Sequence, residues 1–85
     1  MAKMFKLMEN ELDRVYSSLS KTLAFLINVE TFAGYILEDD DRKKYTKEMI
    51  AVTEEILEKT HSMTEKIETE QECIETIKDE ILELL

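Results

Sequence analysis

The chain has 85 residues with one cysteine, one glycine and no proline, and its formal net charge is −9. Such a length forms at most one domain, one cysteine excludes an intrachain disulfide, and a sheet protein needs the turn residues that are scarce here. The negative charge disfavours nucleic acid and anionic membrane surfaces as partners. We therefore expect residues 1–85 to form one soluble, all-α, helical-hairpin domain in an intracellular, cytoplasmic environment.

The first predicted element is a long helix over residues 3–37. Its apolar residues recur with the seven-residue period of a coiled coil, mainly at two heptad positions that we name a and d. Further apolar residues flank them, so the stripe is wider than a two-stranded coiled coil needs. Position a holds Phe5, Leu12, Leu19, Leu26 and Ala33, position d holds Met8, Val15, Thr22, Val29 and Ile36, and the flanks hold Met4, Tyr16, Leu23, Phe25, Phe32 and Leu37.

An acidic segment, residues 38–44, interrupts the apolar pattern and predicts the turn. One of its aspartates is expected to cap the second helix by accepting hydrogen bonds from the first free N–H groups. Ala33 and Gly34 are interpreted as small residues that let the two helices approach closely near this turn. With the turn centred near residues 40–41, facing residues should have numbers that add up to about 81, and the last turn, 81–85, should overhang the N-terminus.

Residues 45–85 predict a second helix with a heptad of its own. Residues 59–64 have middling helix propensity, and an uninterrupted helix is favoured there over a kink. Glu70 falls inside the predicted seam, where pairing with Arg14 is favoured over an opening to water. Position a holds Thr46, Thr53, Thr60, Ile67, Ile74 and Ile81, and position d holds Met49, Ile56, Met63, Glu70, Ile77 and Leu84.

Three groups of residues invite a chemical interpretation. Glu58 and His61 have the Glu-x-x-His spacing of di-iron bundles, with Glu30 on the other helix, but both fall on solvent-facing heptad positions and the sequence has one copy of the motif. Ser62 and His61 are adjacent on a helix and diverge, so they do not form a nucleophile pair. Cys73 is interpreted as a half-buried apolar residue rather than a thiol at an interface. We expect no catalysis, no cofactor and no metal.

The apolar stripe of the first helix is wider than one neighbouring helix covers, and exposed apolar surface marks an interaction site. Residues 1–37 carry four basic and four acidic side chains, whereas residues 38–85 carry seven basic and sixteen acidic ones. The near-neutral first helix therefore suits an interface, and we expect dimerisation into a four-helix bundle. The predicted interaction residues are Phe5, Leu12, Tyr16, Leu19, Leu23, Phe25, Leu26, Phe32, Ile36, Ile67, Ile74 and Ile81.

The sequence therefore predicts a non-enzymatic protein–protein interaction module, namely an assembly subunit, adaptor or scaffold. Its partner would be a second copy or a helical protein, and a basic partner would gain electrostatic steering. The alternative is a small acidic chaperone, antitoxin-like inhibitor or regulator that masks an apolar or basic segment of another protein. A scaffold should form a stable dimer by itself, whereas a chaperone should be stabilised by one specific partner.

Overall fold

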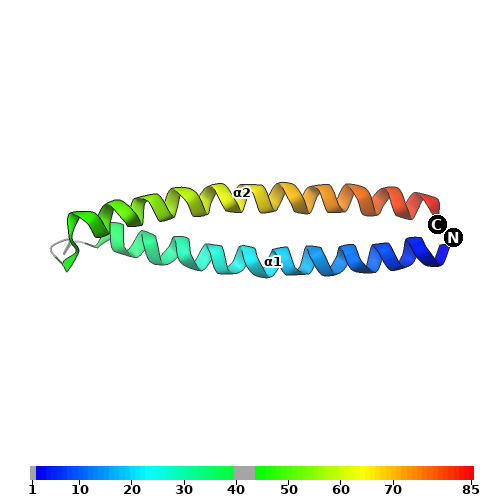
Figure 1. Cartoon of the computed structure of the whole chain (residues 1–85), viewed down its shortest axis with the longest axis horizontal. Helices are drawn as coiled ribbons and strands as arrows, with labels where there is room; N and C mark the ends of the chain where they lie inside the picture. The colour runs from blue at the N-terminus through cyan, green and yellow to red at the C-terminus, as the bar shows by residue number, and fades with distance from the viewer. Residues whose placement is uncertain (1, 40–43) are drawn as a thin grey trace.

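The computed structural model describes residues 2–39 and 44–85. This part of the chain forms two α-helices, α1 (Ala2–Glu38) and α2 (Lys47–Leu84), and contains no strand. The helices lie side by side and antiparallel, so that both ends of the chain are at the same end of the hairpin (Figure 1). α2 runs without a break through residues 59–64, in agreement with the uninterrupted helix favoured by the sequence.

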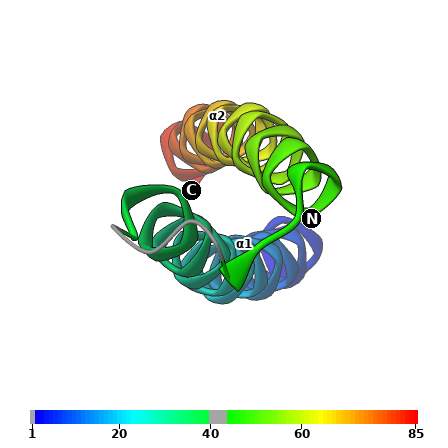
Figure 2. The ribbon, with the colours of Figure 1, turned by 90° about the vertical axis from the view of Figure 1, so that its left-hand side faces the viewer.

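The hairpin is a thin rod. Its principal extents are 64 × 16 × 15 Å and its radius of gyration is 19.0 Å, whereas a compact domain of this length has a radius of gyration of about 12 Å. Seen end-on, the two helix axes wind around one another, as a seven-residue repeat requires (Figure 2). Each helix has a single neighbour, so most of its circumference is open to solvent.

The N-cap of α2 is Thr46, whose Oγ1 accepts a hydrogen bond from the backbone N–H of Met49 at 3.1 Å. The prediction that an aspartate of the acidic segment caps this helix is therefore wrong, and α2 begins two residues later than predicted. Thr46 has the extended backbone that an N-cap requires, with φ −73° and ψ 164°. Residues 40–43 of the predicted turn lie outside the described residues.

Gly34 lies inside α1, and a Cβ built on it would meet no atom within 4 Å. A glycine is therefore not needed for close approach at this position, and that part of the interpretation of Ala33 and Gly34 is wrong. Ala33, by contrast, is only 5% exposed and is the small residue that packs against α2.

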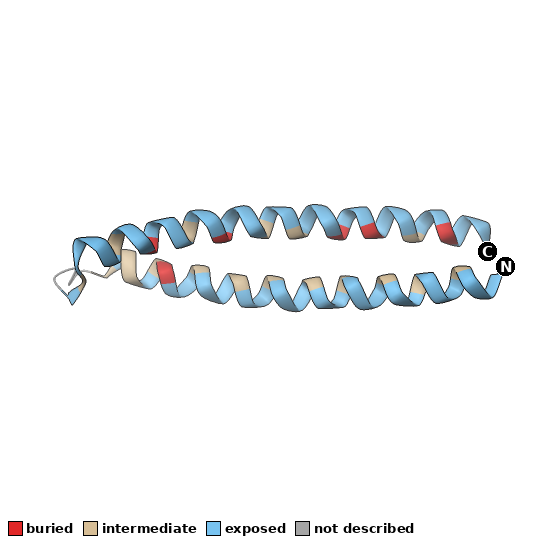
Figure 3. Ribbon diagram, in the orientation of Figure 1, coloured by how far each residue is buried: buried red, intermediate tan, exposed pale blue. Residues whose placement is uncertain are grey.

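The contact between the helices consists of residues spaced alternately three and four apart, and Figure 3 shows them on the facing sides. In the heptads these residues occupy position a and position e, which follows a by four residues. The prediction that position d forms the contact between the helices is therefore wrong. On α1 they are Phe5, Glu9, Leu12, Tyr16, Leu19, Leu23, Leu26, Glu30, Ala33 and Leu37, and on α2 they are Ile50, Thr53, Leu57, Thr60, Thr64, Ile67, Gln71, Ile74, Lys78 and Ile81.

The register of the two helices differs from the predicted one by about ten residues. Hydrogen bonds join Asp13 to Lys78, Tyr16 to Glu75 and Ser20 to Gln71, and the two numbers of each pair add up to 91 rather than 81. The reason is that α2 begins beyond the end of α1 and overhangs it at the turn (Figure 1). The prediction that residues 81–85 extend past the N-terminus is therefore also wrong.

Half of the α2 contact residues are polar, and each of the buried ones has a hydrogen-bond partner. The Thr53 hydroxyl donates to the Met49 carbonyl at 2.7 Å, and the Thr60 hydroxyl donates to the carbonyl four residues before it. The Gln71 amide donates to the Ser20 hydroxyl at 2.8 Å. Burying these groups is tolerable because the bonds to water that they lose are replaced.

Candidate interaction surface

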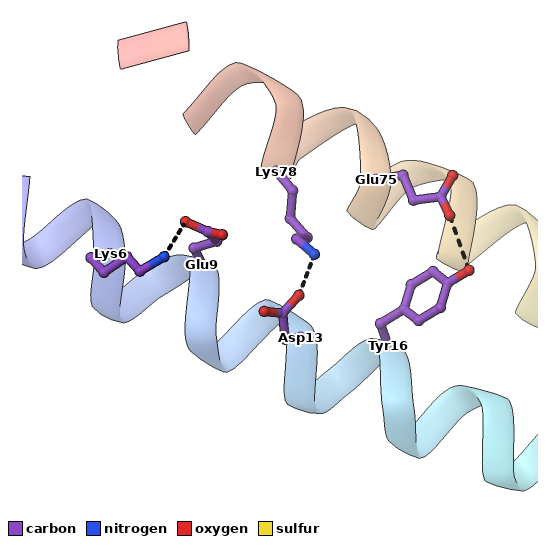
Figure 4. A network of polar contacts seen from close by, with 6 residues as sticks. All are labelled: Lys6, Glu9, Asp13, Tyr16, Glu75 and Lys78. Carbon is purple, nitrogen blue, oxygen red and sulfur yellow. Dashed lines mark hydrogen bonds and ion pairs between the residues drawn. The ribbon is translucent and has the colours of Figure 1, made fainter. Parts of the chain in front are cut away.

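The hairpin has two long sides on which both helices are exposed. On one of these sides, polar bonds join α1 to α2. Lys78 of α2 forms an ion pair with Asp13 of α1, and the Tyr16 hydroxyl donates to the Glu75 carboxylate at 3.0 Å (Figure 4). Glu75, as hydrogen-bond acceptor and negative charge, raises the pKa of Tyr16 above its ordinary value. The hydrogen bond to Asp13 likewise raises the pKa of Lys78. We call this side the polar flank.

The other flank is formed by position d of both helices. Three shallow grooves along it are lined from both sides: by Val15 with Ile77, by Val29 with Ile56, and by Ile36 with Met49. We call this surface the open face. It consists of Met8, Val15, Thr22, Val29 and Ile36 of α1 and of Met49, Ile56, Met63, Glu70, Ile77 and Leu84 of α2.

Large apolar side chains line most of the open face. Ile36 is half-buried, and the exposed fractions of the others run from 39% for Ile77 to 67% for Leu84. Phe25 and Phe32 are still more exposed, at 69% and 63%, and their heptad position places them on the rim of the same face. A continuous apolar surface of this kind is the usual mark of an interaction site on a soluble protein.

One polar layer divides the open face near the middle of the rod. Thr22 on α1 and Glu70 on α2 both fall at position d, and the register of the hairpin places them at the same level. The apolar residues therefore form two halves, one beside the chain ends and one beside the turn. Apart from Glu70, no position d in either helix carries a charge.

The total surface shows how incomplete the hairpin is by itself. Its accessible area is 6764 Å², whereas a globular protein of 10.0 kDa exposes about 5200 Å². The excess of about 1500 Å² follows from the rod shape, in which each helix has a single neighbour.

The structure places most of the predicted interaction residues inside the hairpin rather than on its surface. Ile36 lies at the edge of the contact and lines the open face. Phe25 and Phe32 are the members of this set that are mostly exposed. The others lie along the contact between α1 and α2, namely Phe5, Leu12, Tyr16, Leu19, Leu23, Leu26, Ile67, Ile74 and Ile81.

The predicted interaction residues do not include several exposed apolar residues of the open face, among them Val15, Val29, Ile56 and Ile77. The seven-residue period contains them, but the sequence places position d inside the hairpin. The signal that identifies them is the presence of two apolar stripes on α1, because one neighbouring helix covers only one of them.

The structure also corrects the predicted polar contacts. Arg14 pairs with Glu11 of its own helix at 3.2 Å, and Glu70 is exposed, so the predicted Arg14–Glu70 pair is wrong. Cys73 is exposed rather than half-buried. On the surface of α2, Lys59 and Glu55 pair at 2.6 Å, which raises the pKa of Lys59 and lowers that of Glu55.

The residues of the Glu-x-x-His motif do not converge. His61 lies 3.2 Å from Glu65 on its own helix, and the Glu30 carboxylate accepts a hydrogen bond from the Thr64 hydroxyl at 3.2 Å. Glu30 is thus near the level of His61, whereas facing numbers that add up to 81 would place it opposite residue 51; the difference is the shift in register. Within residues 2–39 and 44–85, no three His, Cys, Asp or Glu side chains are grouped as metal ligands would be.

In the part of the chain that the structure describes, neither helix carries an apolar stretch that would allow it to span a membrane. No protein-family model, curated protein or solved structure matches the chain.

Proposed function

We propose that this chain is a non-enzymatic helical assembly module that works by packing its open face against other helices. The observation that supports the proposal is the stripe of exposed apolar side chains contributed by both helices along the whole rod. Burying such side chains contributes about 25 cal/mol per Å² of apolar area, which makes association the most favourable use of this surface.

Different heptad positions form the hairpin contact and the open face, and this separation supports the same function. In a four-helix bundle each helix has two neighbours and therefore needs two contact stripes. Here positions a and e serve the contact inside the hairpin, and their polar members have partners there, such as Gln71 with Ser20. Position d is the second stripe, and apart from Thr22 and Glu70 its members are apolar on both helices.

The methionines of the open face offer a test that applies to any partner. Met8, Met49 and Met63 are 47–54% exposed in the isolated hairpin, so their thioether groups should react freely with dilute peroxide. Covering the open face should slow that oxidation at least tenfold relative to the chain unfolded in denaturant. We expect this protection in extracts of the native source, measured by mass spectrometry of peptides.

The control is the same extract diluted until complexes dissociate, in which oxidation should become fast. Equal oxidation rates for these three methionines in the undiluted extract and in the unfolded chain would contradict the proposed function.

A further inference from the structure

We propose that the partner on the open face is a second copy of this chain, related to the first by a two-fold axis along the length of the rod. In this arrangement α1 of each copy packs against α2 of the other, and four helices enclose both open faces. The inference rests on the proposed function and adds the identity and the orientation of the partner.

The area available matches a stable homodimer. Each hairpin exposes 6764 Å², whereas a globular protein of twice the mass exposes about 8700 Å². Two hairpins that reached this value would bury about 4800 Å² between them, and this is an upper limit because the dimer stays a 64 Å rod; obligate homodimers start at about 2000 Å². An apolar face that runs the length of the rod also suits a partner of equal length.

The symmetry axis fixes which residues meet. A two-fold axis along the rod does not shift one copy along the rod relative to the other. Each residue of α1 is therefore level with the same α2 residues in the second copy as in its own chain. Position d then meets position d: Val15 lies opposite Ile77 of the second copy, and Val29 lies opposite its Met63. Apolar layers meet apolar layers on both sides of the polar layer.

The polar layer also finds a partner in this arrangement. Thr22 lies opposite Glu70 of the second copy, so that its hydroxyl can donate a hydrogen bond to the carboxylate. A two-fold axis across the rod that passes through the polar layer would instead bring the two Glu70 carboxylates together, and a crosswise axis elsewhere would set each Glu70 against apolar residues. Two like charges at close range are strongly unfavourable away from water.

The charge of the two helices favours the same axis. Residues 1–37 have no net charge, and all nine excess negative charges belong to residues 38–85. The lengthwise axis places the two α2 helices on a diagonal of the bundle, each beside two neutral α1 helices. The crosswise axis places α2 directly against α2, which adds repulsion along the whole contact.

Residues on the rim of the open face also fit the lengthwise dimer. Phe25 and Phe32 lie at the levels of Lys66 and Lys59 of the second copy, at the same heptad position on the outer edge. The aliphatic parts of the lysines can cover the exposed rings, and ammonium groups over aromatic faces are favourable. The lengthwise dimer therefore covers the most exposed aromatic side chains of the open face.

The single natural cysteine makes the orientation measurable. Cys73 is exposed and shares this rim position, where it lies level with Ser18 of the second copy in the lengthwise dimer. In the full chain, Ser18→Cys should form disulfide-linked dimers under mild oxidation at least tenfold faster than Ser17→Cys. The latter is the matched control, because Ser17 is the adjacent serine and its side chain points about 100° away.

A third variant, Lys66→Cys, reports the crosswise dimer whose axis passes through the polar layer, in which residue 66 would lie beside Cys73 of the second copy. Rapid linking of Ser18→Cys alone supports the lengthwise axis. Rapid linking of Lys66→Cys alone overturns this inference and leaves the proposed function standing. Slow linking of all three variants, with methionines protected in extracts, overturns the lengthwise dimer, and a purified chain that is also monomeric then overturns the second copy as partner. Slow linking with unprotected methionines overturns the proposed function as well.

Discussion

Replacing both Val29 and Ile56 by glutamate is expected to convert the associated protein into monomers of 10.0 kDa. The two side chains line the same groove of the open face, and each is 41% exposed in the isolated hairpin. Association would bury the introduced carboxylates without partners, at a cost of several kcal/mol each. We therefore expect the dissociation constant to rise at least about 1000-fold, measured by sedimentation equilibrium.

A matched control exists on the polar flank. Ile27 and Leu82 are 49% and 52% exposed and are also large apolar residues. The double substitution Ile27→Glu and Leu82→Glu makes the same change in charge, but it should leave the mass in solution unchanged. Loss of association in this control with retention in the open-face variant would place the interface on the polar flank. The helix content of both variants should be retained, as measured by circular dichroism.

Ile74→Ala is expected to destabilise the hairpin by about 2–4 kcal/mol. Ile74 is 7% exposed at the contact between α1 and α2, where the structure buries few large side chains. Truncating it removes apolar contacts and leaves a cavity that a rod with a single layer of contacts cannot refill. The loss is a large fraction of the stability of a small domain.

Urea denaturation at a fixed protein concentration measures this loss, because association couples stability to concentration. Leu82→Ala is the control, since Leu82 is 52% exposed on the polar flank, and it should change the free energy of unfolding by less than about 0.5 kcal/mol. Equal effects of the two substitutions would show that the a and e positions do not form the hairpin contact.

The helices and the approximate place of the turn follow from the sequence because their causes are local. A sustained seven-residue period and the lack of proline predict two long helices, and the charged segment after Leu37 breaks the period. The structure has the helices at Ala2–Glu38 and Lys47–Leu84, within two residues of the predicted bounds.

The face that each helix turns toward the other does not follow from the period. On α1, position d is apolar except for Thr22, whereas position e mixes Tyr16, Leu23 and Leu37 with two glutamates, so the sequence favours position d for the contact. On α2, position e includes Thr64, Gln71 and Lys78, which favours an outward orientation when the helix is considered alone. These residues lie inward because Glu30, Ser20 and Asp13 of α1 bond to them, and such pairs are known only once the register is known.

The register itself depends on the connection between the helices. A helical period fixes the rotation of a helix but not its axial position relative to another helix. The connection here spans residues 39–46, and α2 extends past the end of α1, which shifts the facing pairs by about ten residues from a symmetric turn. The predicted interaction residues were therefore largely those of the hairpin contact, and the surface available to a partner was assigned to the inside.

The mass of the unmodified chain in solution tests the central claim most directly. Sedimentation equilibrium at tens of micromolar protein should give about twice the chain mass of 10.0 kDa, falling toward that mass only on strong dilution. A fully helical, cooperatively folding protein that stays at 10.0 kDa across this range would contradict self-association through the open face.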